Sequence, residues 1–431
     1  MDRHYLPIVT TFYYSYNRVA AAPYNFPTGL PVQHQQLKRR KKLPEKTRQK
    51  SKIIRCKQII PAVPGQQAMD NACIVCHDNT IVEVGPYRTL KKKYSAATTD
   101  LGQVTITPGL INAHSHLNLS GLYNKTRDGE GFIPWLLSLL ANDYRTTDFS
   151  SVKKAAISAQ QQGTCCFGDI LSGHNLHLTD ILDELQLHYT CFYEAFGFPH
   201  ADAQHPSIPY RTTPLQRISG AGHALHTTDP DCLRVIKRQT RARNLPFSIH
   251  LAEHQDEMTM LMGEKNSFYN LLKDRELLGN TYRPPMKTAV EYARDLGILD
   301  AATLAVHCVH ISDKDLNILL KSGTNICLCP RSNLFIDVGR APMEKIIDSG
   351  ISVSLATDSL ASNHDLNLWN ELFHFLKTIE RDFTLEEAVQ LLTINPARAL
   401  LMDRELGSFE KGKIFRYGVV PEEIVTYFEK K

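Results

Sequence analysis

Eight short apolar runs recur along the chain, and they limit the folds open to it more than any other feature. Most of them are apolar on both faces, which is typical of parallel strands buried between helices. Helix-like segments lie between most of the runs, for example 229–244, with Asp229 as an N-cap, and 312–323, with Ser312 before it. Eight alternating strand and helix units predict an α/β fold, a (β/α)8 barrel of the TIM type. The runs span residues 104–113, 164–170, 189–196, 217–225, 247–252, 304–309, 325–329 and 351–356.

Strand-like sequence outside the barrel comes from both ends of the chain. We therefore predict a small β-sandwich domain from residues 52–106 and 405–431, and a barrel from residues 107–404. Residues 1–50 hold ten Lys or Arg and two Asp or Glu without clear periodicity, which favours a disordered basic tail. A transit peptide and a nuclear or nucleic-acid patch are the alternatives for this segment.

The formal net charge of +4 does not describe the body of the chain. Outside residues 1–50 there remain 39 of the 49 basic and 43 of the 45 acidic side chains. This mildly acidic balance argues against nucleic acid as a partner of the whole protein. No apolar run reaches the ~18–20 residues that a membrane-spanning helix needs. Ten scattered cysteines favour free thiols in a reducing compartment, so we expect a cytoplasmic protein.

The segment CIVCH, at 73–77, matches the CxxCH pattern of covalent haem attachment. Attachment of haem needs export and an open loop. We find no signal-peptide pattern, and Ile74 and Val75 look like the interior of a strand. We therefore interpret the match as a coincidence within a strand.

Ionisable side chains gather where the predicted strands end, which is where barrels of this kind carry their chemistry. Residues i and i+2 of a strand point to the same face, so His114 and His116 can both face one ion. His250, in the fifth run, would supply a third nitrogen, and Asp358, after the eighth, an oxygen. Three imidazoles, one carboxylate and an open position suit Zn²⁺, with Fe²⁺ as the alternative.

Other polar residues near the strand ends are less simple to interpret. Glu253 follows His250 by three residues, so in an extended strand the two would point to opposite faces. Glu253 can reach the site only if the chain turns just after Leu251. His307 ends the sixth run, whereas His310 lies three residues further on in a predicted turn, where we expect a structural role.

Four motifs resemble those of the amidohydrolase superfamily, in its metal-dependent, adenosine-type deaminase branch. The likeness covers residues 52–415 and implies one divalent metal ion bound by His114, His116, His250 and Asp358. Binuclear members carry a modified lysine at the end of the fourth strand, and the stretch ISGAGHALHTT has none. The motifs are PGLINAHSHL (108–117), HLAE (250–253), VHCVH (306–310) and ATDSLASN (356–363).

The resemblance also implies roles for five side chains. Glu253 would shuttle protons, His307 would contact the water or the leaving group, and Asp358 would orient the attacking water. His223 and Ser362 match residues that contact the substrate. General acid–base transfer of this kind contributes ~10²–10⁴-fold to rate.

Two segments, 283–299 and 327–342, look like the aminofutalosine deaminases of menaquinone synthesis. The stretch 262–285 could form a lid over the mouth of the barrel. Asn118 departs from this subgroup, in which many relatives carry Glu, and so leaves the substrate open. The C-terminal stretch GSFEKGKIFRYGVV departs as well, since it lacks the Ala-Asp of the family's Gly-Lys-Ala-Asp turn.

We therefore predict a hydrolase that converts the adenine of a nucleoside-like substrate, aminofutalosine first among them, to hypoxanthine and releases ammonia. Deaminases of S-adenosylhomocysteine, methylthioadenosine or guanine and triazine chlorohydrolases are alternatives. A noncatalytic amidohydrolase-like interaction protein is a more distant one. The expected partner is a small molecule, with neither nucleic acid nor membrane, and a homodimer is one option.

Overall fold

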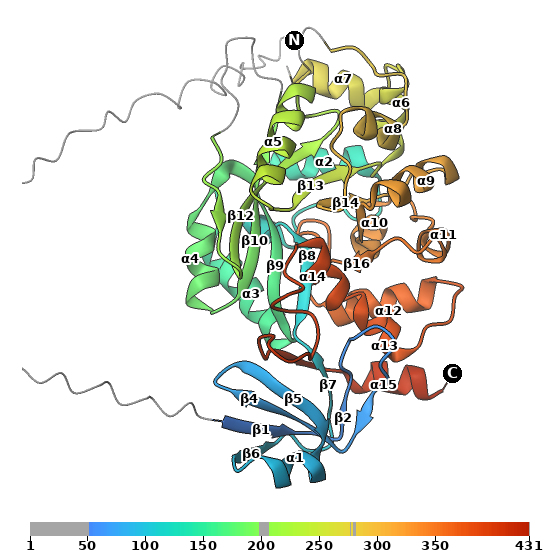
Figure 1. Cartoon of the computed structure of the whole chain (residues 1–431). Coiled ribbons are helices and arrows are strands. Elements are labelled where there is room, and N and C mark those ends of the chain that lie inside the picture. Colours follow the sequence, from blue (N-terminus) through green and yellow to red (C-terminus); the bar gives the residue numbers. More distant parts are fainter. Residues whose placement is uncertain (1–50, 198–206, 276, 279–281, 431) are drawn as a thin grey trace, which may run out of the picture. The chain divides into compact units, whose positions relative to one another are not determined.

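The barrel is closed by eight parallel strands. The computed structural model describes residues 51–197, 207–275, 277–278 and 282–430, so the tail predicted at residues 1–50 lies outside the described residues. The strands follow the order β16-β15-β14-β13-β12-β10-β9-β8, and a bridge between Ser115 and Asp358 joins the two edges (Figure 1). The predicted (β/α)8 barrel is therefore confirmed. Its strands are β8 Leu110–Ser115, β9 Thr164–Leu171, β10 His188–Ala195, β12 Gln216–Ala224, β13 Phe247–Leu251, β14 Thr303–His307, β15 Asn325–Leu328 and β16 Val353–Leu355, and β11 Arg211–Thr212 pairs with β12.

Helices cover the outside of the barrel, and their ends follow local rules. Asp229 caps the first helix after β12 by accepting from the amides of Asp231 and Cys232, as its position before Pro230 predicts. Ser312 and Asp315 form a capping box in the helix after β14. The barrel helices are η1 Leu117–Leu122, α2 Phe132–Ala141, α3 Phe149–Gln161, η2 Ser172–His174, α4 His177–Glu184, α5 Pro230–Ala242, α6 Gln255–Leu261, α7 Ser267–Asp274, α8 Ala289–Asp295, α9 Asp313–Ser322, α10 Pro330–Ile336, α11 Met343–Asp348, α12 Leu368–Thr378, α13 Leu385–Gln390, α14 Ile394–Ala399 and α15 Glu422–Glu429.

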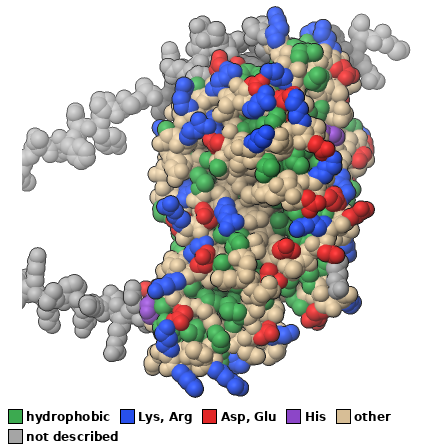
Figure 2. Space-filling model, turned by 45° about the vertical axis from the view of Figure 1, so that its right-hand side comes forward, with side chains coloured by type: hydrophobic (Ala, Val, Ile, Leu, Met, Phe, Trp, Pro, Cys, Tyr) green, Lys and Arg blue, Asp and Glu red, His purple; other side chains and the backbone are tan. Residues whose placement is uncertain are grey.

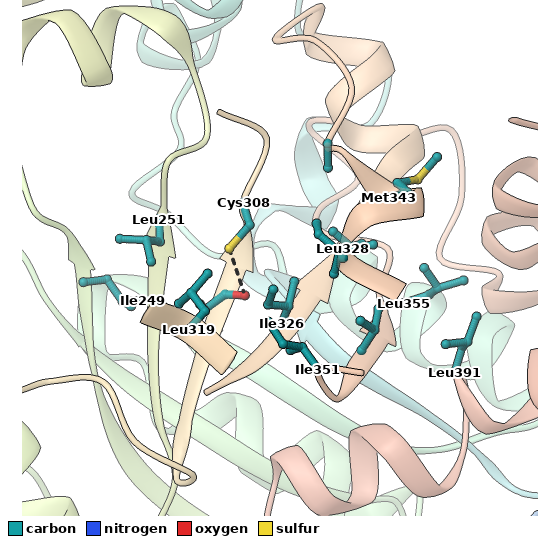
Figure 3. Packing of buried hydrophobic residues seen from close by; sticks show 14 of the residues in the cluster. Ile249, Leu251, Cys308, Leu319, Ile326, Leu328, Met343, Ile351, Leu355 and Leu391 are labelled. Carbon is teal, nitrogen blue, oxygen red and sulfur yellow. Dashed lines mark hydrogen bonds between the residues drawn. The ribbon is translucent and has the colours of Figure 1, made fainter. Parts of the chain in front are cut away.

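Alternate residues of each strand belong to different apolar layers. Outward-facing side chains of β13, β15 and β16 pack against Leu319 of α9 and Met343 of α11 (Figure 3). Side chains of the other parity fill the interior of the barrel, among them Ile170, Phe192 and Ala221. This two-sided burial explains why the strands appear in the sequence as continuous apolar runs. The outward-facing residues labelled in Figure 3 include Ile249, Leu251, Ile326, Leu328 and Leu355.

The first predicted run, 104–113, is divided into two strands. β7 (Thr105–Pro108) belongs to a small sheet outside the barrel, and β8 begins the barrel itself. Gly109 stands at the break, where a Cβ atom would lie 2.6 Å from Cys165 Sγ and 2.9 Å from Arg416 Cβ. The single strand that we predicted there is wrong, because the chain leaves one sheet at Pro108 and enters the other at Leu110, and only a residue without a Cβ fits between them.

Two four-stranded sheets outside the barrel are built from both chain ends. Their orders are β5-β4-β1-β6 and β17-β7-β2-β3, and apolar side chains of both, such as Ile74 and Ile106, share one cluster. This is the predicted β-sandwich, and Figure 1 places it near the start of β8, away from the carboxyl ends of the barrel strands. The elements are β1 Ser51–Arg55, β2 Gln58–Ile59, β3 Met69–Asp70, β4 Ala72–His77, β5 Thr80–Pro86, α1 Tyr87–Lys93, β6 Ala97–Asp100 and β17 Tyr417–Val419.

The CxxCH segment lies within strand β4 of this domain. Cys73 and Cys76 pack into different apolar clusters, as residues of opposite parity in a strand must, and both are fully buried. His77 contacts Ser51 Oγ through Nδ1 at 2.6 Å. Two thiols on opposite faces cannot both bind one haem, so the interpretation as a strand interior is confirmed. All ten cysteines are free and buried.

The surface carries charges of both signs. Figure 2 shows Lys and Arg side chains interspersed with Asp and Glu over the face in view. Among the residues that the structure describes, no helix combines the length and apolar character needed to cross a bilayer.

Candidate metal centre and active site

The four predicted metal ligands meet inside the carboxyl end of the barrel. His114 Nε2 lies 3.4 Å and His116 Nε2 lies 3.6 Å from Asp358 Oδ1, and His116 Nε2 lies 3.3 Å from His250 Nε2. All four residues are buried. His307 comes close enough to form a further group with His114 and His250, whose ligand atoms lie within 4.8 Å of one another.

Neighbouring groups aim the ligand atoms at a common point. His250 Nδ1 donates to the carbonyl oxygen of His223 at 2.9 Å, which leaves Nε2 as the free lone pair. Asp358 Oδ2 accepts from the hydroxyls of Ser332 and Ser362, each at 2.7 Å, which leaves Oδ1 facing the histidines. Such outer contacts fix tautomer and orientation before an ion binds.

The protonation states also suit a cation. Burial lowers the pKa of His116 to about 3 and holds the pKa of His250 well below its usual value, and the neighbouring imidazoles act in the same direction. Burial opposes ionisation of Asp358, but the facing imidazoles of His114 and His116 keep its pKa well below the usual range. Neutral imidazoles whose Nε2 atoms face one another at 3.3 Å, beside an ionised carboxylate, are the donor set of a divalent metal ion.

The chain turns just after Leu251, which we had given as the condition for Glu253 to reach the site. β13 ends at Leu251, and Ala252 has a φ of 55°. Glu253 Oε1 consequently lies 3.5 Å from His307 Nε2. Burial raises the pKa of Glu253 to about 7, and His307 opposes that rise. A carboxyl group that can hold or release a proton near neutral pH is suited to proton transfer.

Two residues that we did not predict hold these catalytic candidates in place. Glu257 accepts from the amides of both Ala252 (3.2 Å) and Glu253 (2.8 Å) with its two carboxylate oxygens. Asn333 Oδ1 lies 2.9 Å from His307 Nδ1, which it can accept from, so that His307 Nε2 faces Glu253. Glu257 lies in the first turn of a helix, where acidic residues are ordinary, so its position alone gave no signal.

The two predicted substrate contacts, His223 and Ser362, both lie at this centre, but their side chains have different partners. The ring of His223 lies 5.1 Å from that of His250, with its Nδ1 2.5 Å from Thr227 Oγ1. The Ser362 hydroxyl points to Asp358, so in this structure it orients a predicted metal ligand. His310 contacts the carbonyl oxygen of Val338 through Nε2 at 2.8 Å, in agreement with the structural role that we expected.

The segment that we predicted as a lid contains α7, which packs against α2. Phe268 of α7 meets Phe132 edge to face at 5.6 Å, and Phe132 stacks on His254 at 3.7 Å. Residues 276 and 279–281 of the segment lie outside the described part.

Asn118, where the sequence departs from its relatives, is buried in η1 beyond His116.

Comparison with known proteins agrees with this geometry. The chain matches the model of the amidohydrolase family over residues 105–427, and it therefore belongs to that family of hydrolases. It is 28% identical over 384 residues to a 5-methylthioadenosine/S-adenosylhomocysteine deaminase of Thermoanaerobacter pseudethanolicus, covering 81% of this chain and 80% of the relative.

Solved structures share the fold. Aminofutalosine deaminase of Helicobacter pylori, in complex with methylthio-coformycin, superposes with a TM-score of 0.76 at 22% identity, covering 88% of this chain and 96% of that one. An adenosine deaminase of Xanthomonas campestris with bound zinc superposes with a TM-score of 0.69 at 19% identity, covering 85% and 83%. These two structures show that the fold is shared.

Proposed function

We propose that this protein is a metal-dependent hydrolytic deaminase of adenine nucleosides. The observation that carries the proposal is the convergence of His114, His116, His250 and Asp358 beside Glu253, which faces His307 at 3.5 Å. The reaction adds water to the amino-bearing carbon of the adenine ring and releases ammonia, leaving hypoxanthine. Similarity to deaminases of methylthioadenosine and S-adenosylhomocysteine, and the shared fold with aminofutalosine deaminase, support a nucleoside with a modified 5′ end.

One divalent ion, Zn²⁺ first and Fe²⁺ second, would be held by the three histidines and Asp358. When bound, such an ion lowers the pKa of water toward ~7. Glu253 would accept one proton from the attacking water and deliver it to the adjacent ring nitrogen. It would then take the second proton from the hydroxyl newly added to the ring carbon and give it to the amino group, which leaves as ammonia while the C=O bond forms. A His307 ring that carries both protons can donate from Nε2 to the negative charge that develops on the oxygen added to the ring carbon, while its Nδ1 donates to Asn333 Oδ1. Asn333 keeps that nitrogen aimed at the site.

A substrate panel tests the proposal directly. The zinc-loaded protein is incubated with aminofutalosine, methylthioadenosine, S-adenosylhomocysteine, adenosine, guanine and a chlorotriazine, and ammonia or chloride release is measured. We expect ammonia release and the adenine-to-hypoxanthine absorbance change with one or more of the adenine nucleosides. The matched control is Glu253→Gln, which keeps the shape and removes the titrating proton, and it should retain metal while losing activity by ~10²–10⁴-fold.

Three results would contradict the proposal. Turnover of the chlorotriazine alone, or of guanine alone, would show that the same centre catalyses a different reaction. Full activity of Glu253→Gln would show that protons travel by a different group, whereas loss of metal from that variant would make Glu253 a ligand.

A further inference from the structure

Asp169 is a carboxylate of strand β9 that the proposed mechanism does not use. Its Oδ1 accepts from the Ser115 hydroxyl at 2.7 Å and from the Leu117 amide at 2.9 Å. Ser115 and Leu117 are the two neighbours of His116 in the chain. Asp169, Ser115 and Leu117 are fully buried, so water does not compete for these contacts. One oxygen of Asp169 therefore holds the chain on both sides of a predicted metal ligand.

The pairing of β8 with β9 is irregular just before these contacts. Two residues of β8, Ala113 and His114, oppose one residue of β9, Gly168. Such a β-bulge is common next to active sites, where it redirects a side chain. A Cβ at Gly168 would lie 2.2 Å from the carbonyl oxygen of Ala113, so the close approach of the two backbones at the bulge requires a glycine.

The bulge changes which side chains of β8 face the interior of the barrel. Ile111 and Ala113 belong to the apolar cluster of the interior, so in a regular strand His114 would point outward. Instead, His114 Nε2 lies 3.4 Å from Asp358 Oδ1, and His116 reaches the same oxygen two residues later. A shift of one residue moves every later side chain to the other face. The two histidines therefore reach the centre only because the bulge is in place.

The contacts of Asp169 come directly after the bulge, where they can hold this shifted register. Ser115, the first residue after Ala113 and His114, is the first that Asp169 binds. The helix η1 begins at Leu117 and has no side-chain cap from its own N-cap residue. Asp169 thus also supplies an acceptor for an amide that the start of a helix leaves without a partner.

We propose that Asp169 is a positioning residue for the metal centre, because its contacts on either side of His116 hold His114 and His116 in the shifted register. The inference rests on the metal ligands of the proposed function but not on its substrate. Loss of a group that orients metal ligands from outside costs about 10- to 100-fold in metal affinity. We expect the affinity for Zn²⁺ to fall by about that factor in Asp169→Ala.

Chelator competition measures the Zn²⁺ affinity of the full chain without any substrate. Asp169→Asn is the conservative variant, because one amide oxygen can still accept from both the Ser115 hydroxyl and the Leu117 amide, and it should bind Zn²⁺ nearly as the wild type does. Ser115→Ala removes one of the two donors, so it should weaken binding less than Asp169→Ala. The variant with both alanines should bind no more weakly than Asp169→Ala, since the hydroxyl acts through this carboxylate.

Asp315→Ala is the matched control that separates positioning from stability. Asp315 is buried at the start of α9, where its Oδ2 accepts from the Ser312 hydroxyl at 2.6 Å and the Ser312 amide at 2.9 Å. Asp169 holds the same pair of donor types. We expect both alanine variants to lower Tm, and only Asp169→Ala to weaken Zn²⁺ binding. The visible spectrum of the Co²⁺-loaded protein, which reports ligand geometry, should likewise change in Asp169→Ala but not in the control.

Wild-type Zn²⁺ affinity in Asp169→Ala overturns the proposal, and so does an equal loss in Asp169→Asn or in Asp315→Ala. If Asp169→Ala does not fold, Ser115→Ala decides by the same measurement, and an unaltered affinity overturns the proposal. A wild type that binds Zn²⁺ but deaminates none of the adenine nucleosides refutes the proposed function, and the affinities still decide the role of Asp169. A wild type that binds no divalent ion refutes both.

Discussion

Substitution of Glu257 should show how far activity depends on the turn that positions Glu253, because it leaves Glu253 and the predicted metal ligands unchanged. Its two carboxylate oxygens hold the amides of Ala252 and Glu253 at 3.2 and 2.8 Å. Ala252 has a φ of 55°, a left-handed conformation that costs a residue with a Cβ about 1–2 kcal/mol. Glu257 thus offsets the strain of the turn that directs Glu253 toward His307.

The size of the effect follows from those two hydrogen bonds. In Glu257→Gln the side chain keeps one acceptor oxygen and turns an NH₂ group toward the second amide. A hydrogen bond to a charged group contributes about 1.5–3 kcal/mol, which is comparable to the strain that it offsets. Since each 1.4 kcal/mol is about a factor of ten, we expect kcat to fall about 10- to 100-fold with little change in KM. At about 2.1 cal/mol/K per residue over Lys50–Lys431, the same loss lowers Tm by about 2–4 °C.

Steady-state kinetics, metal analysis and thermal unfolding of the variant make the assay. Glu387→Gln is the matched control, because Glu387 makes a similar amide contact at the start of α13. We expect the control to lower Tm slightly and to leave kcat unchanged. A Glu257→Gln protein with a lowered Tm but wild-type kcat would refute the reasoning, since the turn would then be held without its carboxylate.

Three further outcomes follow from the structure. His250→Ala should lower the metal content from about one ion per chain, and equal content by elemental analysis would remove His250 from the ligand set. Gly168→Ala places a Cβ 2.2 Å from the carbonyl oxygen of Ala113 and should cost at least about 1–3 kcal/mol in thermal unfolding, whereas Gly85→Ala, with its nearest contact at 3.6 Å, should not. Burial raises the pKa of Asp169 to about 7 from 3.8, so the folded state holds a proton that the unfolded state has released. The stability that this group contributes is therefore lost as pH rises from about 4 to 7, at up to about 1.4 kcal/mol per unit; Asp169→Asn should remove that part of the slope in Tm, and parallel profiles of the two proteins would contradict it.

The barrel could be predicted because each strand is buried on both faces and so leaves a continuous apolar run. The convergence of His114, His116, His250 and Asp358 could be predicted because strand ends in a barrel converge, whatever the helices between them do. The break at Gly109 had a local signal in the Pro108-Gly109 pair, but the residues that crowd this junction, Cys165 and Arg416, lie far along the chain. Local pattern carries no information about such distant contacts.

The supporting residues escaped prediction for a related reason. Glu257 resembles any acidic residue in a first helical turn, and Asn333 any polar residue after a proline. Each residue matters because of the group that it contacts, and that contact is formed only in the folded chain.

The same construction appears at three strand ends of the site. Ala252, His307 and Asp358 all have positive φ, at 55°, 72° and 59°, although none of them is glycine. At each point the strand ends and the chain bends, so that a polar side chain enters the centre. Each bend also has a polar contact beside it: Glu257 for the first, Asn333 for the second, and the His114 carbonyl, which accepts from the Asp358 amide at 3.2 Å, for the third. Strain of about 1–3 kcal/mol persists at such positions only where neighbours over-determine the conformation. These three contacts therefore support the bends that bring Glu253, His307 and Asp358 into the centre.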